Sequence, residues 1–159
     1  MSNAIDQIGI LAIATRLQRL SELLRKDGLQ IYKAHGIDFE PKWFPVIYTL
    51  HLNPIMSVVE IANEIGYTHP STISLLKELE VLKLIKSKKD KTDTRKRMIS
   101  LTEKGKKLVD EIKPVWGIIG SSLADLTDSP NNLMQAIIEV EERYRRKSLL
   151  DRALTQMEQ

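Results

Sequence analysis

The 159-residue sequence contains no cysteine. Thiolate catalysis, redox sensing through a thiol, iron–sulfur clusters and cysteine-based zinc sites are therefore excluded. Disulfide bonds are excluded too, but a chain of this length removes roughly two-thirds of its unfolded surface from water on folding. It can therefore form a core without a disulfide or a structural metal, and its composition is that of one ordinary soluble domain.

Long apolar runs are also absent. The longest uninterrupted stretch of apolar residues and glycine, Ile8 to Ala14, is far shorter than the roughly 20 residues that cross a bilayer. No basic residue precedes it, as a secretory signal peptide would require. We therefore expect a cytoplasmic protein that has no membrane partner.

Patterns of catalytic residues are missing as well. The sequence has no glycine-rich phosphate loop and no Ser/His/Asp constellation at a recognisable spacing. It also has no pair of carboxylates placed so that a shifted pKa would be expected. Its three histidines, His35, His51 and His69, are far apart and do not have the spacing of metal ligands. We expect no enzymatic activity, no cofactor and no metal.

The net charge of +3 is the sum of two unlike parts. Residues 83–107 contain eleven basic and three acidic side chains, a net charge of +8, whereas the other 134 residues sum to −5. Such a concentration of positive charge is typical of a surface that binds a polyanion. A solvated lysine-rich loop is the commoner alternative, so the neighbouring segments must decide between the two.

Two short helices precede the basic segment. Ser57 and Glu60 form a capping box, which predicts a helix over residues 58–65 that ends at Gly66. Thr68 is the next N-cap, and Pro70 suits the first turn of a second helix. The apolar stripe of that second helix comprises Thr72, Leu75, Leu76, Leu79 and Leu82.

The opposite face of the second helix is small, polar and basic. It carries Pro70, Ser74 and Lys77, flanked by Ser71 and Ile73. Two capped helices with a glycine turn and such an outer face predict a helix-turn-helix. An ordinary helical hairpin would show the same caps but would not leave this polar face exposed.

A basic hairpin follows. Residues 84–87 and 96–101 are strand-like and flank a charged connection over 88–95, which predicts the wing of a winged helix. The tip of such a wing reaches the minor groove, where narrow A·T-rich tracts favour arginine. Asp93 can pair with Arg95 or accept turn amides, and so aim its guanidinium.

Further helices flank this unit. We predict a first helix from about Asp6 to His35-Gly36, with the apolar stripe Ile10, Ile13, Leu17, Leu20 and Leu24, and a second from Pro41 onward. Another begins after Thr102 and is kinked or interrupted by Pro114 and Gly117. Ser129-Pro130 opens a final helix carrying Leu133, Ile137, Val140 and Tyr144.

These elements together resemble the MarR family of bacterial winged-helix regulators. The resemblance covers nearly the whole chain and is most specific over Ser57 to Leu84 and in the wing string Asp90-Lys91-Thr92-Asp93-Thr94-Arg95 that leads into Leu101-Thr102-Glu103-Lys104-Gly105. It implies a homodimer formed by the first and last helices, and it implies that Arg95 is the minor-groove arginine oriented by Asp93. Lys83 departs from the pattern, because the family usually has glycine at this position. Lys83 must therefore adopt a left-handed backbone conformation, or the preceding helix must end in another way.

The expected fold is mainly α with a small β-hairpin wing, a winged helix-turn-helix with N- and C-terminal dimerisation helices. We assign residues 5–36 and 108–157 to dimerisation and 37–107 to DNA binding. The expected function is sequence-specific regulation of transcription, as a repressor, by a homodimer on double-stranded DNA that a small effector releases. The alternative is a winged helix used for protein contact, without specific DNA binding.

Two groups of site residues follow. The DNA-binding residues are expected to be Thr68, His69, Pro70, Ser71, Ile73, Ser74, Lys77, Lys88, Arg95 and Arg97. Trp43, Tyr48 and His51 could line an effector pocket, but such a cluster is more often part of the core.

Overall fold

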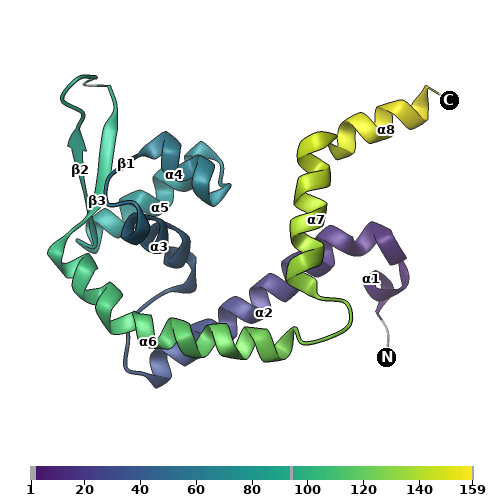
Figure 1. Cartoon of the computed structure of the whole chain (residues 1–159), viewed down its shortest axis with the longest axis horizontal. Coiled ribbons are helices and arrows are strands. Elements are labelled where there is room, and N and C mark those ends of the chain that lie inside the picture. The colour runs from purple at the N-terminus through teal and green to yellow at the C-terminus, as the bar shows by residue number, and fades with distance from the viewer. Residues whose placement is uncertain (1–2, 94, 159) are drawn as a thin grey trace. The chain divides into compact units, whose positions relative to one another are not determined.

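A computed structural model describes residues 3–93 and 95–158 of the chain. Most of it is helical, with one three-stranded antiparallel sheet (Figure 1). The chain divides into two compact units, Met1–Gly117 and Ile118–Gln159. No helix in the described ranges is both long and apolar enough to span a bilayer.

The N-terminal segment is not a single helix. It consists of α1 (Ala4–Gln7), the 3-10 turn η1 (Gly9–Ala12) and α2 (Ile13–Ala34). Continuity from Asp6 was therefore a wrong prediction, because Gly9 has φ = 72°, a left-handed conformation that an α-helix cannot contain. The predicted end at His35-Gly36 is confirmed, with Gly36 at φ = 69°.

The next helix supplies much of the core. Pro41 begins the 3-10 turn η2 (Pro41–Trp43), and Pro45 lies in the first turn of α3 (Phe44–Leu52). Both prolines lie in first turns, where a missing N–H leaves no helical hydrogen bond unmade. Val46 and Ile47 of α3 are completely buried.

The two predicted helices of the helix-turn-helix are confirmed as α4 (Val58–Ile65) and α5 (His69–Val81). The Ser57 amide donates to Glu60 Oε2 at 2.7 Å, and the Glu60 amide donates to Ser57 Oγ at 3.2 Å. Gly66 takes the left-handed turn at φ = 69°. Thr68 Oγ1 accepts from the Ser71 amide at 3.3 Å and so caps α5, which we call the recognition helix.

The wing is the β2–β3 hairpin, which projects beyond α4 (Figure 1). Strand β2 (Ile85–Lys89) pairs antiparallel with β3 (Arg97–Leu101). A third strand, β1 (Met56–Ser57), pairs with the other edge of β3 and was not predicted, because two residues carry no periodic pattern. It anchors the start of α4 to the base of the wing.

Lys83 and Thr102 join the recognition helix to the next helix. Lys83 has φ = 59°, so it adopts the left-handed alternative. Thr102 Oγ1 donates to the Lys83 carbonyl at 2.6 Å and accepts from the Gly105 amide at 3.0 Å. Gly105 is required here, because a Cβ at this position would overlap the Leu84 carbonyl oxygen.

Helix α6 (Glu103–Leu126) runs through Pro114 and Gly117 as one helix, so of the predicted kink or interruption the interruption was wrong. The boundary between the two units falls within this helix. Proline removes one amide donor, and the remaining hydrogen bonds of this long helix maintain it across that position.

The second unit continues with α7 (Leu133–Arg146) and α8 (Leu149–Met157). Asn132, not Ser129-Pro130, opens α7, because its Oδ1 accepts from the Gln135 amide at 2.9 Å. Helix α8 was not predicted as a separate element, although Ser148 and Asp151 form a capping box at its start. Within the described residues of α7 and α8, no side chain is buried.

Candidate nucleic-acid interface

The outer face of α5 is open to solvent. Ser71, Ser74 and Lys77 are exposed and Ile73 is half-buried. Thr72, Leu76 and Leu79 on the inner face are at most 1% exposed. Thr68, His69 and Pro70 are exposed at the N-terminus of the helix, where the helix dipole favours an anion such as phosphate.

The recognition helix α5 and the wing line the same cavity. A cavity of about 540 Å³ lies between them, and it is lined by His69 and Ile73 from α5, by Arg95, Lys96 and Arg97 from the wing, and by residues 57–60 at the start of α4. The structure therefore brings together predicted site residues that are more than twenty positions apart in the sequence. Lys96 was absent from the predicted set, although it belongs to the basic segment.

Hydrogen bonds to Asp90 organise the wing turn. Asp90 Oδ1 accepts from the Thr92 amide at 2.8 Å, from Thr92 Oγ1 at 2.6 Å and from the Asp93 amide at 2.8 Å. The Thr92 hydroxyl bond is the main reason that the pKa of Asp90 falls to about 2. This acidic side chain therefore shapes the turn. Thr94, which belongs to the motif string, lies outside the described residues.

Arg95 is oriented by Asp93, as the sequence predicted. Asp93 Oδ1 accepts from both the Arg95 backbone amide at 3.1 Å and Arg95 Nε at 3.2 Å. The Arg95 side chain is nevertheless 91% exposed. Its terminal nitrogens are thus held at the tip of the wing and face solvent.

Arg97 has a different environment. Its Nη2 donates to Glu80 Oε1 at 2.9 Å and Oε2 at 3.1 Å, and to Ser87 Oγ at 3.2 Å. Glu80 belongs to α5, so this ion pair links the recognition helix to the wing. Sequence reasoning missed Glu80, because a contact between residues 17 positions apart leaves no local pattern.

Lys88, the remaining wing residue of the predicted set, is exposed on the other side of the hairpin. It lines a separate groove of about 750 Å³ together with His51, Lys86 and Met98. It is therefore not part of the cavity between α5 and the wing.

The three aromatic candidates for an effector pocket do not share one cavity. Trp43 is 6% exposed and donates from Nε1 to Glu78 Oε1 at 2.9 Å. Tyr48 stacks on Phe44, with ring centroids 5.2 Å apart. His51 lines the groove that also contains Lys88.

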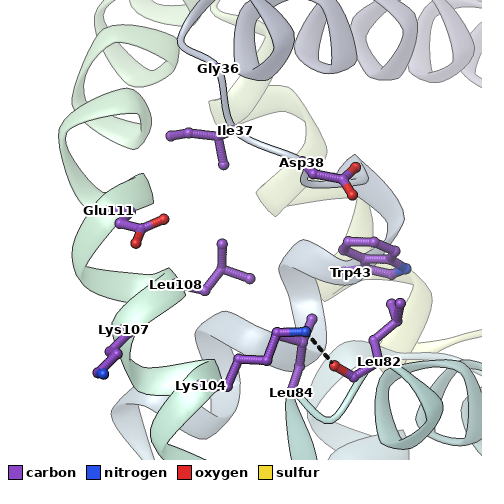
Figure 2. A pocket seen from close by; sticks show the side chains of 10 residues that line it. All are labelled: Gly36, Ile37, Asp38, Trp43, Leu82, Leu84, Lys104, Lys107, Leu108 and Glu111. Carbon is purple, nitrogen blue, oxygen red and sulfur yellow. Dashed lines mark hydrogen bonds between the residues drawn. The ribbon is translucent and has the colours of Figure 1, made fainter.

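Trp43 also contributes to a pocket at the end of the recognition helix. Figure 2 shows this cavity of about 500 Å³, in which Lys104 Nζ donates to the Leu82 carbonyl at 2.8 Å. Glu78 accepts from Lys42 Nζ at 2.8 Å as well as from Trp43, and the Lys42 hydrogen bond is the main cause of its lowered pKa. These bonds hold the C-terminal part of α5 against η2.

No protein-family model matches the chain. Among solved structures, the DNA complex of MepR from S. aureus matches with a TM-score of 0.68 and 21% identity, over 84% of this chain and 97% of that one. The repressor CouR bound to a 23-mer DNA duplex matches with a TM-score of 0.66 and 24% identity, over 87% and 96%. BpsR of Bordetella bronchiseptica matches with a TM-score of 0.60 and 19% identity, over 80% and 98%.

The fold is that of the MarR-type winged-helix regulators. This fold extends over most of the chain, since the three matches cover between 80% and 87% of it. It also accommodates the departure at Lys83, because the chain keeps the left-handed turn after the recognition helix and places lysine there instead of glycine.

Proposed function

We propose that this protein is a transcriptional regulator that binds specific double-stranded DNA as a homodimer. One observation carries the proposal: an exposed arginine, Arg95, is held by Asp93 at the wing tip, across a cavity from the exposed face of the capped helix α5. A helix in the major groove and an arginine in the adjacent minor groove require this arrangement.

In this proposal, the contacts divide by chemistry. Ser71, Ile73, Ser74 and Lys77 face the base edges of the major groove, and Thr68, His69 and Pro70 approach the phosphate backbone at the start of α5. Arg95 enters the minor groove, and Lys88 adds positive charge along the wing. Arg97, which carries a Glu80 partner, maintains the position of the wing.

Dimerisation is assigned to residues 5–36 and 108–157, and DNA binding to residues 37–107. Exposed apolar side chains in both terminal regions support this assignment, because isolated chains rarely leave so many uncovered. In the N-terminal region these include Ile10 and Leu11, at 78% and 83% exposed. In the second unit they include Val140, Tyr144, Leu149 and Leu150.

Repression and release by a small effector complete the proposal. CouR is a transcriptional repressor, and the DNA binding of BpsR is regulated by 6-hydroxynicotinic acid. The pocket in Figure 2 is a candidate effector site, because its wall includes Trp43, which is hydrogen-bonded to the recognition helix.

A selection of bound duplexes from a random pool tests the proposal, with oligomeric state measured by light scattering. We expect a dimer that enriches a pseudo-palindrome whose half-sites lie about one helical turn apart. The affinity for that site should fall steeply as salt rises, because phosphate contacts release counterions. A monomer that enriches no sequence and binds DNA independently of salt would contradict the proposal and favour a protein-contact module.

A further inference from the structure

The exposed face of the recognition helix α5 offers hydrogen-bond donors. Lys77 is exposed, and none of the ion pairs between described residues includes it. Its ammonium group has three donors and no acceptor. Ser71 Oγ accepts from Thr68 Oγ1 at 2.9 Å, so the proton of the Ser71 hydroxyl remains available to donate. Both side chains can therefore donate to a base edge that presents acceptors.

The strong side-chain acceptors of α5 are engaged elsewhere. Glu78 accepts from residues of η2, and Glu80 accepts from the wing. The helix contains no Asp, Asn or Gln, which are the other side chains that accept from the amino groups of bases. The hydroxyl of Ser74 can both donate and accept, so it favours neither kind of base edge. On α5, a base that presents an amino group therefore meets no free carboxylate or amide.

Ile73 adds an apolar group to this surface. It is half-buried and lines the cavity that α5 shares with Arg95 and Arg97 of the wing. The exposed part of its side chain can be removed from water when DNA binds, which is favourable. In the major groove, the C5-methyl group of thymine is the apolar group that a base edge presents. Ile73 is therefore suited to contact thymine.

The four bases differ in the groups that they present in the major groove. Guanine presents two acceptors, N7 and O6, and thymine presents the O4 acceptor beside its methyl group. Cytosine presents the N4 amino group, and adenine presents the N6 amino group beside N7. A surface of donors with one apolar side chain thus matches guanine and thymine, the two keto bases.

We propose that the recognition helix reads keto bases. Lys77 donates to O6 and N7 of a guanine, Ile73 contacts the methyl group of a thymine, and Ser71 donates to a keto oxygen. Ile73 and Lys77 are about 6 Å apart along the helix axis, so the two bases lie within about three base pairs of each other. The inference rests on the proposed function, which leaves open the identity of the bases that α5 contacts.

Base analogues in the selected duplex test each contact with the full-length protein. Uracil in place of thymine removes the C5-methyl group, and 7-deazaguanine in place of guanine removes the N7 acceptor. Each analogue is placed in turn at every thymine or guanine of a half-site. We expect one uracil to weaken binding about fourfold, as the loss of one buried methyl group does. One 7-deazaguanine should weaken it about fivefold.

Protein variants assign each analogue effect to a side chain. Ile73→Ala should bind the thymine and uracil duplexes equally and should keep the 7-deazaguanine effect. Lys77→Ala should lose the 7-deazaguanine effect and keep the uracil effect. The crossed combinations are the matched controls, because a variant that only weakens the fold or the overall affinity leaves both analogue effects unchanged.

A gained acceptor should change the base that is read. Lys77→Gln gives α5 an amide that donates and accepts, which matches N7 and the N6 amino group of adenine. A second selection with this variant should replace guanine by adenine at one position of each half-site and retain the thymine. Retention of the guanine would show that Lys77 does not read it.

The outcomes separate this inference from the proposed function. A selection that enriches no sequence contradicts the proposed function and the inference with it. An enriched site that binds equally well with both analogues would overturn the keto-base inference and leave sequence-specific binding intact. Analogue effects that persist in both Ile73→Ala and Lys77→Ala would overturn it as well.

Discussion

Arg97 and Glu80 connect the wing to the recognition helix through one guanidinium nitrogen, which lies 2.9 and 3.1 Å from the two carboxylate oxygens of Glu80. The pair is partly shielded from water, with side-chain exposures of 41% for Arg97 and 26% for Glu80. It therefore sets the spacing between the two surfaces that are proposed to enter adjacent grooves.

Glu80→Gln tests this positioning role. Removing a negative charge should by itself strengthen DNA binding, because DNA is a polyanion. We expect weaker binding instead, since the wing is no longer held, together with a loss of about 0.5–1.5 kcal/mol in the free energy of unfolding. Titration with the selected duplex and urea unfolding measure the two effects.

Glu64 on α4 provides the control, because it is an exposed acid and none of the ion pairs between described residues includes it. If Glu80→Gln binds DNA as tightly as Glu64→Gln, Glu80 does not position the wing.

Arg95→Ala should separate binding from stability. The affinity for the selected duplex should fall by about 1–3 kcal/mol, because a groove-reading arginine is lost. The free energy of unfolding should stay within about 0.5 kcal/mol, since the side chain is 91% exposed. Arg16→Ala, at an exposed position of α2, removes the same charge away from the wing. An equal loss of affinity in both variants would show only a general effect of charge.

Asp90 gives the wing turn a defined pH dependence. Its pKa is lowered from 3.8 to about 2, first by the Thr92 hydroxyl and then by two backbone amides. The stabilisation is fully present above pH 3.8 and is lost as the pH falls through about 2, because the protonated acid accepts these bonds less well. The Thr92 and Asp93 amide shifts, followed by NMR, should titrate with a midpoint near 2.

Two variants check that assignment. Asp90→Asn should abolish the titration at both amides, and Thr92→Val should move its midpoint upward, because the hydroxyl donor is gone. A midpoint of 3.8 in the unmodified protein would show that the Asp90 hydrogen bonds do not persist in solution.

Lys83→Gly should stabilise the protein. A left-handed backbone costs a residue with a side chain roughly 1 kcal/mol, which glycine avoids, although glycine loses more entropy on folding. We expect the free energy of unfolding to rise by up to about 1 kcal/mol in urea titrations. The matched change Lys33→Gly, in the last turn of α2, should instead lower it by about 0.5–1 kcal/mol. A loss of stability in both variants would mean that the Lys83 side chain contributes more than its strained backbone costs.

Short-range signals explain the predictions that hold. The Ser57–Glu60 box, the Gly66 turn and the Thr68 cap join residues at most four positions apart, so the sequence is enough to identify them. The same reasoning failed at Ser129-Pro130, because Asn132 competes as a cap a few residues later and satisfies the Gln135 amide. A local sequence pattern does not show which of two nearby capping residues begins the helix.

Contacts across the fold lie beyond such reasoning. Trp43 is an aromatic residue in an apolar cluster, and its hydrogen bond to Glu78 spans 35 positions. In the sequence, Glu80 looks like any acidic residue of a helix. Its ion pair with Arg97, 17 positions away, forms only in the folded chain. Strand β1 exists only because β3 offers a free edge to Met56 and Ser57.

The absence of cysteine, the basic segment over residues 83–107 and the caps of α4 and α5 are properties of the chain itself, because composition and hydrogen bonds between near neighbours need no fold. They were sufficient to predict a winged helix and to propose a polyanion as its partner. Tertiary packing divided the basic residues by role. It left Arg95 in solvent, paired Arg97 with Glu80 and placed Lys86 and Lys88 over an apolar groove. Charge alone does not distinguish these lysines and arginines, because only folding determines which of them meets a carboxylate and which remains unneutralised.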